Sequence, residues 1–276
     1  SVGIDGGLPD KEPGMDLTTM DYEVSDGVAH LRLTRPEGAN AVSSAFARDL
    51  RAVMLEIEWD NDVKAVSVTA EGRVFCAGGD LKEFHEAGDG LPRLASNMLT
   101  DFHGGIYKMN RMAKPFVAGV NGAAGGAGLS IVSAFDLVVC GESAKFTMAY
   151  TRAGMTPDGT SSYFLARHIG VRRALDLTLT NRVLSASEAE AWGLVNRVVP
   201  DDEVHAATAQ LARTLADGPV WALGHAKNLI YSGFDSPLEQ AGELEGVTIT
   251  AAMGSIDGRE GIAAFVEKRP AQFGRS

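Results

Sequence analysis

Two glycine-rich turns decide the fold of this chain: Cys76-Ala77-Gly78-Gly79-Asp80 and Asn121-Gly122-Ala123-Ala124-Gly125-Gly126-Ala127-Gly128. Each follows a short apolar run typical of a strand, at 65–70 and at 116–120, and each precedes helical periodicity. Glycine lets the backbone approach a ligand closely, and the first N–H groups of a helix have no intrahelical acceptor. Together the turns predict an oxyanion hole, in which two N–H groups bind one oxygen. Either turn alone is more typical of a tight loop.

The composition is that of a globular protein with an acidic balance. The chain has 276 residues, of which 45% are hydrophobic and 22% charged, and its formal net charge is −11. This length fits one large domain, or a domain with a small appendage. Nucleic-acid binding depends on clustered cations, and the chain has no Lys- or Arg-rich run, so we expect no nucleic-acid partner. No apolar run approaches the ~20 residues that span a bilayer, so we expect no membrane association.

The cysteines and the N-terminal segment indicate the compartment. Cys76 and Cys140 both lie in apolar, strand-like contexts and form neither a disulfide framework nor a metal-ligand pattern. We therefore predict buried thiols, no metal site and a reducing, cytoplasmic location. Residues 1–19 are polar, rich in Gly, Pro and Asp, and lack the apolar core of a signal peptide. We interpret them as a flexible N-terminal arm.

Hydrophobic periodicity predicts an α/β core followed by helices. A hairpin is expected at 22–34, around the turn Asp26-Gly27. Repeated strand–helix–strand order implies a largely parallel sheet with right-handed crossovers. The expected strands are 65–70, 116–120 and 137–140. The expected helices are 43–59, 94–112 and 125–134, and then 204–216, 220–231 and 238–253.

The two turns and several later motifs resemble the crotonase superfamily, the enoyl-CoA hydratase/isomerase family, whose members act on acyl-CoA thioesters. The resemblance covers residues 20–273, nearly the whole chain. It implies a crotonase-like spiral of repeated ββα units at 20–200 and a C-terminal helical region at 201–276. That region would mediate assembly into a homotrimer or a dimer of trimers. The matching segments are 76–83, 114–128, 136, 144–146, 154–159, 161–167, 191–195 and 265–269.

The resemblance also implies the residues that bind the substrate. The oxyanion donors would be the backbone N–H groups of Gly79 and Ala127. Ala127 replaces the usual glycine, and its methyl group disfavours positive φ. Coenzyme A would enter as part of the substrate, with no tightly bound cofactor. The acyl pocket is expected from Phe84, Met98, Phe102, Ser130 and Tyr150. Coenzyme A contacts are expected from Arg35, Lys82, Phe265 and Lys268, the last two from a neighbouring subunit.

The departures from the family pattern concern the acid–base groups. Hydratases of the family use two glutamates, and this chain has Ser130 and Tyr150 at those positions. Neither side chain is a carboxylate base at neutral pH, which disfavours hydration. Asp158 lies where some family isomerases have their base and other members a nucleophile. The stretch Thr156-Pro157-Asp158-Gly159 before a helical run is equally typical of a helix N-cap.

His103, on the expected helix 94–112, is a second catalytic candidate. The pair of His103 and Asp158 resembles the arrangement in 4-chlorobenzoyl-CoA dehalogenases, in which an aspartate attacks the aromatic ring and a histidine assists water. A histidine on such a helix is also typical of a pocket wall or of the core. The catalytic role of His103 therefore stays open at this point.

The sequence predicts an acyl-CoA enzyme that stabilises a thioester enolate. The favoured reaction is enoyl-CoA isomerisation, a double-bond shift between positions 3 and 2 with Asp158 as base, because one carboxylate is enough to move one proton. One alternative is an aryl-CoA dehalogenase or acyl-CoA hydrolase with Asp158 as nucleophile. Another is a catalytically silent CoA-binding or scaffold protein.

Overall fold

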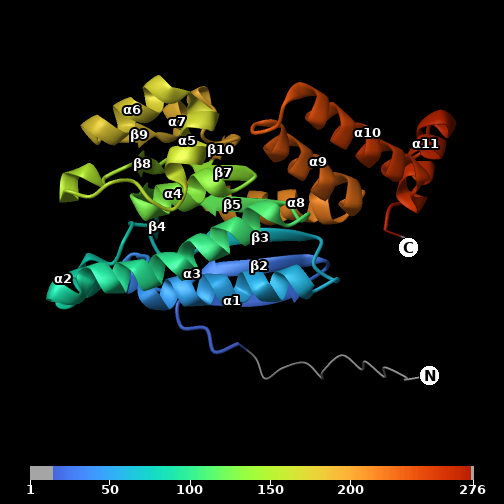
Figure 1. The fold of residues 1–276 in the computed structure, drawn as a ribbon. Helices are drawn as coiled ribbons and strands as arrows, with labels where there is room; N and C mark the ends of the chain where they lie inside the picture. Colours follow the sequence, from blue (N-terminus) through green and yellow to red (C-terminus); the bar gives the residue numbers. More distant parts are fainter. Residues whose placement is uncertain (1–14, 275–276) are drawn as a thin grey trace, which may run out of the picture.

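The computed structural model describes residues 15–274, which fold around two β-sheets (Figure 1). The larger sheet has the strand order β1-β2-β3-β5-β7-β10, and the smaller has the order β4-β6-β8-β9. The larger sheet comprises β1 (Met20–Ser25), β2 (Val28–Leu33), β3 (Ala65–Ala70), β5 (Phe116–Val120), β7 (Leu137–Gly141) and β10 (Arg197–Val199). The smaller comprises β4 (Val74–Cys76), β6 (Ala123–Gly125), β8 (Lys145–Thr147) and β9 (Leu184–Ser185).

Strands enter the two sheets alternately, and this alternation builds the spiral. β3, β5 and β7 pair in parallel in the larger sheet, while β4, β6 and β8 pair in parallel in the smaller one. Each pair of consecutive strands therefore contributes one strand to each sheet before a helix follows. The predicted ββα spiral is confirmed.

Helices cover the sheets and form the end of the chain (Figure 1). Those of the core are α1 (Ser44–Trp59), α2 (Leu81–Glu86), α3 (Leu91–Arg111), α4 (Ala127–Ala134), α5 (Ser161–Ile169), α6 (Val171–Thr180) and α7 (Ala186–Trp192). Those that follow are α8 (Val204–Ala216), α9 (Val220–Gly233), α10 (Leu238–Gly254) and α11 (Ile256–Glu267). None of the helices within residues 15–274 is long and apolar enough to cross a membrane.

The first elements form as their sequence predicts. β1 and β2 pair antiparallel across Asp26 (φ +51) and Gly27 (φ +77), which take the positive φ values that a two-residue hairpin turn requires. Ser43 caps α1 by accepting a hydrogen bond from the Phe46 N–H at 3.2 Å. The apolar face of α1 then packs against α3, with Gly105 of α3 directly over Leu50.

The start of the described chain is held to the core. Asp49 Oδ2 accepts hydrogen bonds from the backbone N–H groups of Thr18 and Thr19, both at 2.9 Å, and from the Thr19 hydroxyl at 2.8 Å. Thr19 is buried as a result. Thr18 and Thr19 belong to the stretch 1–19 that we interpreted as a flexible arm, and residues 1–14 lie outside the described residues.

Both cysteines are free and buried, as predicted. Burial raises the pKa of each thiol to about 12, so neither is a thiolate at neutral pH. Cys76 ends β4 and begins the first glycine-rich turn, and its carbonyl oxygen lies where a Cβ on Gly128 would collide with it. The two turns therefore lie against each other with no room for side chains between them.

Candidate active site

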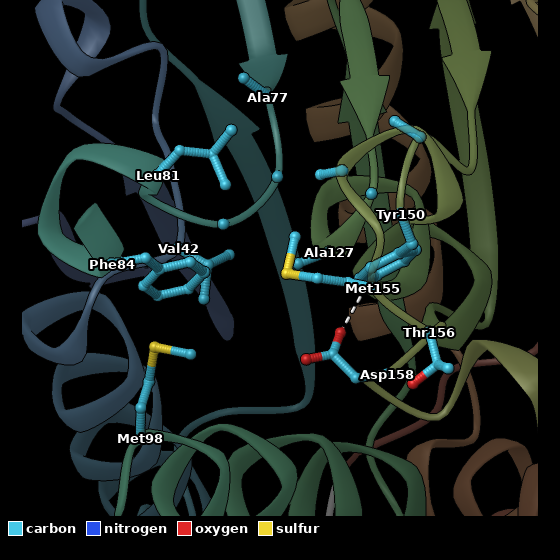
Figure 2. Close-up of a pocket in the computed structure, with 15 residues that line it drawn as sticks. Val42, Ala77, Leu81, Phe84, Met98, Ala127, Tyr150, Met155, Thr156 and Asp158 are labelled. Atoms are coloured by element: carbon cyan, nitrogen blue, oxygen red, sulfur yellow. Dashed lines mark hydrogen bonds between the residues drawn. The ribbon is translucent and has the colours of Figure 1, made fainter. Parts of the chain in front are cut away.

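A cleft of about 130 Å³ opens beside the two glycine-rich turns (Figure 2). One wall is the backbone of both turns, and a second carries Leu81, Phe84 and Met98 from α2 and α3. The third wall is the segment after β8, which contributes Tyr150 and Asp158. Figure 2 shows Phe84 and Met98 on one side of the open space and Tyr150 and Asp158 on the other. The side chains on the walls are therefore apolar apart from Thr156 and the point where Tyr150 and Asp158 meet.

The first turn is fixed by a short parallel bridge to Val42, two residues before α1. The Val42 N–H donates to Gly78 O at 2.7 Å, and the Asp80 N–H donates to Val42 O at 2.9 Å. Because N–H groups alternate in direction along an extended chain, the Gly79 N–H points away from Val42. Gly78 adopts φ +115, and a Cβ there would lie 2.9 Å from Gly125 O. Glycine is therefore required at this position.

The second turn begins α4 and explains why alanine is tolerated at position 127. Gly126 takes the positive φ, +48, and its N–H donates to Thr147 O at 3.0 Å. Ala127 is the first residue of α4 and is not among the residues with positive φ, so its methyl group causes no backbone strain. Gly79 and Ala127 both line the cleft. Within residues 15–274, neither of their N–H groups donates to a protein acceptor.

Asp158 is held by its side chain rather than used as a helix cap. The Tyr150 hydroxyl donates a hydrogen bond to Asp158 Oδ1, and the N-cap residue of α5 is Thr160. Burial raises the pKa of Asp158, although the hydrogen bond from Tyr150 and the nearby His103 act to lower it. The Asp158 carboxylate and the Tyr150 hydroxyl thus meet at the third wall of the cleft (Figure 2).

Ser130 and a kink in the backbone position Tyr150. Ser130 Oγ, fully buried on α4, lies 2.8 Å from the Tyr150 hydroxyl oxygen. Ala149 adopts φ +49, a left-handed conformation that is uncommon for a non-glycine residue, and it directs the chain so that Tyr150 faces the cleft. Burial and the Asp158 carboxylate raise the pKa of Tyr150, so its hydroxyl keeps its proton at neutral pH.

His103 lies behind Asp158 and outside the lining of the cleft. Its Nε2 accepts a hydrogen bond from the Gly159 N–H at 3.1 Å, so the backbone engages this nitrogen. Gly159 has φ +56, and a Cβ there would lie 2.9 Å from the Phe102 ring. His103 therefore fixes the peptide that follows Asp158.

The structure corrects part of the predicted acyl pocket. Phe84, Met98 and Tyr150 line the cleft, but Phe102 and Ser130 are completely buried behind it. Phe102 faces inward from α3, and its ring packs edge-on against Phe46 at 6.5 Å between centroids. The lining also includes apolar residues that the predicted acyl pocket lacked: Val42, Leu81, Ala149, Ala153 and Met155. The last four lie within three residues of the predicted site residues Lys82, Tyr150 or Asp158, which is a local signal, whereas Val42 has none.

The predicted coenzyme A residues fall into two groups. Arg35 lies near the first turn, with one guanidinium nitrogen 3.1 Å from Ser43 Oγ and the other 3.5 Å from Asp80 Oδ2. Lys82 is exposed on α2, and its nearest carboxylate is Glu86 at 4.0 Å. Helix α11 lies at the far end of the molecule from α2 (Figure 1), and it carries Phe265 and ends directly before Lys268. These two residues are therefore remote from the cleft of their own chain.

Comparisons with known proteins agree with this architecture. A family profile described as "Enoyl-CoA hydratase/isomerase" matches residues 23–276. The chain is 37% identical over 248 residues to 4-chlorobenzoyl coenzyme A dehalogenase-2 from Arthrobacter sp, covering 89% of this chain and 90% of that one. It is 35% identical over 251 residues to the 1,2-epoxyphenylacetyl-CoA isomerase of Escherichia coli (strain K12), covering 91% and 96%.

A solved structure has the same fold. The crystal structure of an enoyl-CoA hydratase from Polaromonas sp. JS666 superposes with a TM-score of 0.88 at 30% identity, covering 92% of this chain and 99% of that chain. The profile match, the relatives and the shared fold span the two glycine-rich turns and the cleft between them. This chain therefore belongs to the enoyl-CoA hydratase/isomerase family of the crotonase superfamily.

Proposed function

We propose that this protein is an enoyl-CoA isomerase that shifts a double bond from position 3 to position 2, with Asp158 as its base. One observation carries the proposal: Asp158 is the only carboxylate among the residues that line the cleft, within the described range 15–274. It lines the same cleft as Gly79 and Ala127, the residues of the proposed oxyanion donors. An isomerase needs one group that removes a proton and returns it elsewhere on the same substrate.

The proposed reaction moves one proton and conserves all electrons. Asp158 removes a proton from C2, and the C2–H electron pair becomes a C1–C2 double bond while the thioester carbonyl becomes an oxyanion. The Gly79 and Ala127 N–H groups stabilise that charge most when it is fully developed, in the dienolate. The C3–C4 electron pair then takes the proton from Asp158 at C4. The C1–C2 pair moves to C2–C3, and the carbonyl re-forms.

Hydration is disfavoured because the cleft has no second carboxylate to manage water. Ser130 and Tyr150 replace the two glutamates, and burial keeps the pKa of Tyr150 above its ordinary value. The apolar lining beside Asp158 suits a carbon acid more than a water nucleophile.

Nucleophilic attack by Asp158 on an aryl-CoA is the second candidate. The 37% identity to a protein named 4-chlorobenzoyl coenzyme A dehalogenase-2 favours it, as does the closeness of His103 to Asp158. The bond from the Gly159 N–H occupies His103 Nε2, however, and His103 does not line the cleft. A histidine that activates water needs a free nitrogen facing the ester intermediate, so the geometry supports isomerisation better.

The test is incubation of the protein with a 3-enoyl-CoA in deuterated water. We expect 2-enoyl-CoA in which the proton taken from C2 is delivered to C4, so that C4 holds less deuterium than full exchange with the solvent would give. We also expect loss of conversion in Asp158→Asn, and full conversion in Asp62→Asn, a control at an exposed acid. Retained conversion in Asp158→Asn refutes Asp158 as the base. No conversion by the native protein refutes the isomerase. Labelling of Asp158 by ¹⁸O-water during turnover of an aryl-CoA would then establish the nucleophilic route.

We also propose that coenzyme A enters only as part of the substrate, and that Phe265 and Lys268 contact it in a neighbouring subunit of a homotrimer. Exposed apolar side chains on α10 and α11 support assembly: Leu238, Val247, Ile249, Met253, Ile262, Phe265 and Val266. Light scattering is expected to give three times the 29.1 kDa chain mass, or six times for a dimer of trimers. A mass of one chain refutes this assembly.

A further inference from the structure

We propose that Ser130 and Tyr150 form a directed hydrogen-bond relay that selects the reactive oxygen of Asp158, holding Oδ1 and leaving Oδ2 to move the proton. The proposal rests on the isomerase function above. Tyr150 donates to Oδ1, and within residues 15–274 no donor is bonded to Oδ2. Figure 2 shows the second carboxylate oxygen pointing away from Tyr150 into the open part of the cleft.

The single proton of the Tyr150 hydroxyl determines which group donates and which accepts along the relay. A tyrosine hydroxyl has one proton, and the Tyr150 proton is used in the bond to Asp158. The 2.8 Å contact between Ser130 and Tyr150 is then satisfied only if the Ser130 hydroxyl donates. The alternative acceptor for Ser130, Gly126 O, is farther away at 3.3 Å. The order is therefore Ser130 to Tyr150 to Asp158, and each bond polarises the next.

The relay links the base to the oxyanion hole through one helix turn. Ser130 lies on α4, the helix whose first residue, Ala127, carries one proposed oxyanion donor. The Ser130 N–H donates to Gly126 O at 3.0 Å, and a Cβ on Gly159 would lie 2.8 Å from Ser130 Cβ. Since Ser130 and Gly159 are in such close contact, the base cannot shift relative to the hole without moving α4.

The relay also sets the proton affinity of Asp158. Burial raises the pKa of this carboxyl, and the bond from Tyr150 lowers it by favouring the charged form. The other groups that face Asp158 are His103 from α3, which also lowers its pKa, and Ser130 from α4, which acts through Tyr150. Loss of the Tyr150 hydroxyl must therefore move the pKa of Asp158 further upward.

The experiment compares Tyr150→Phe and Ser130→Ala with the native protein. In Tyr150→Phe we expect the acid limb of the kcat/KM profile to move up by about one pH unit, with kcat falling at least tenfold and KM nearly unchanged. Ser130→Ala is expected to give a smaller shift in the same direction. The matched control is Tyr163→Phe, because the Tyr163 hydroxyl also bonds a carboxylate, Asp235, at 2.7 Å, but outside the cleft. It is expected to leave the profile unchanged.

A second readout separates this proposal from the proposed function. The carboxyl of Asp158 can be titrated by ¹³C NMR, its signal assigned by its loss in Asp158→Asn, without any turnover. An upward pKa shift in Tyr150→Phe supports the relay even if 3-enoyl-CoA is not converted. Unchanged titration of Asp158 in both Tyr150→Phe and Ser130→Ala overturns it, even if the protein is an isomerase. If Tyr150→Phe does not fold, the titration of Ser130→Ala decides alone.

Discussion

Lys227 Nζ lies 2.9 Å from Asp136 Oδ2, forming an ion pair that is almost completely buried between α9 and the start of β7. The same ammonium donates to Met109 O at 2.8 Å and to Lys114 O at 3.0 Å, and the Phe116 N–H donates to Asp136 Oδ2 at 2.8 Å. The pair therefore fastens α9 to the larger sheet and to the end of α3. It is a buried polar link between the C-terminal helices and the core.

Removing one partner of this pair is expected to be costly. Lys227→Met leaves the Asp136 carboxylate buried without its counterion, which should lower the free energy of unfolding by about 3–5 kcal/mol. Urea unfolding measures this loss. Lys82→Met, at an exposed lysine 4.0 Å from its nearest acid, is the control and should change stability by less than about 1 kcal/mol. A loss below about 1 kcal/mol in Lys227→Met contradicts the role given to the pair.

Two neighbouring glycines of α3 should respond in opposite ways to alanine. A Cβ on Gly104 would lie 3.9 Å from Arg51 Cδ, so Gly104→Ala should stabilise the helix by about 0.5–1 kcal/mol. A Cβ on Gly105 would lie 2.9 Å from Leu50 Cγ, so Gly105→Ala should destabilise the protein by roughly 1–3 kcal/mol. Thermal unfolding of the two variants gives the comparison. Equal effects would contradict the packing of α1 on α3.

Proline at position 127 should remove one proposed oxyanion donor and keep the helix. Proline is tolerated at the first position of a helix, which Ala127 occupies in α4, but it has no N–H. We expect Ala127→Pro to lower kcat by about 10²–10³-fold. Retention of the native far-UV circular dichroism checks the fold. Ala127→Gly, which keeps the N–H, is the matched variant, and a similar loss in both would exclude the N–H as the cause.

The raised pKa of Asp158 should make part of the stability depend on pH. Between its ordinary value of 3.8 and its raised folded value, Asp158 keeps its proton in the native state while the unfolded chain is ionised. The native state binds more protons there, so this contribution to stability is lost as pH rises through the folded pKa. At pH 7 the native protein therefore bears the cost of burying a charged Asp158 carboxylate. Asp158→Asn removes that cost, and the variant should be more stable than the native protein by on the order of 1 kcal/mol at pH 7.

The same comparison at acid pH provides the control. Below the pKa of the unfolded chain both states are protonated, so the difference between Asp158→Asn and the native protein should shrink as pH falls below 4. Urea unfolding at several pH values follows it. A difference that is constant with pH would show that the folded pKa is not raised.

The long strands and helices could be predicted because their apolar residues form a recognisable pattern in the sequence. Strands β3, β5 and β7 and helix α1 each carry an uninterrupted apolar pattern, and their expected ranges agree with the observed ones to within one residue. The strands of the smaller sheet have only two or three residues, which is too short to show alternation. The positions of these short strands depend on their contacts with the larger sheet and the glycine turns. Such tertiary contacts leave no pattern in the local sequence.

The candidate site was predictable where the backbone determines it. Glycine at 78, 126 and 128 marks the two turns, because any side chain there would meet backbone or force an unfavourable φ. The chain of bonds among Ser130, Tyr150 and Asp158 was not predictable, because it joins α4 to the segment after β8 through tertiary packing. Phe102 shows the limit of periodicity: it lies one helix turn beyond Met98, on the same face, yet it contacts Phe46 in the core.

The main-chain origin of the two facing N–H groups has a consequence for how this cleft can be redesigned. Their position depends on glycines that tolerate almost no change, whereas the polar groups beside them come from three side chains, at 130, 150 and 158. The proposed oxyanion donors therefore come from the main chain and the proposed acid–base groups from side chains, and α4 carries a member of each set. Substituting side chains while keeping both turns is a way to give this backbone other reactions of a thioester.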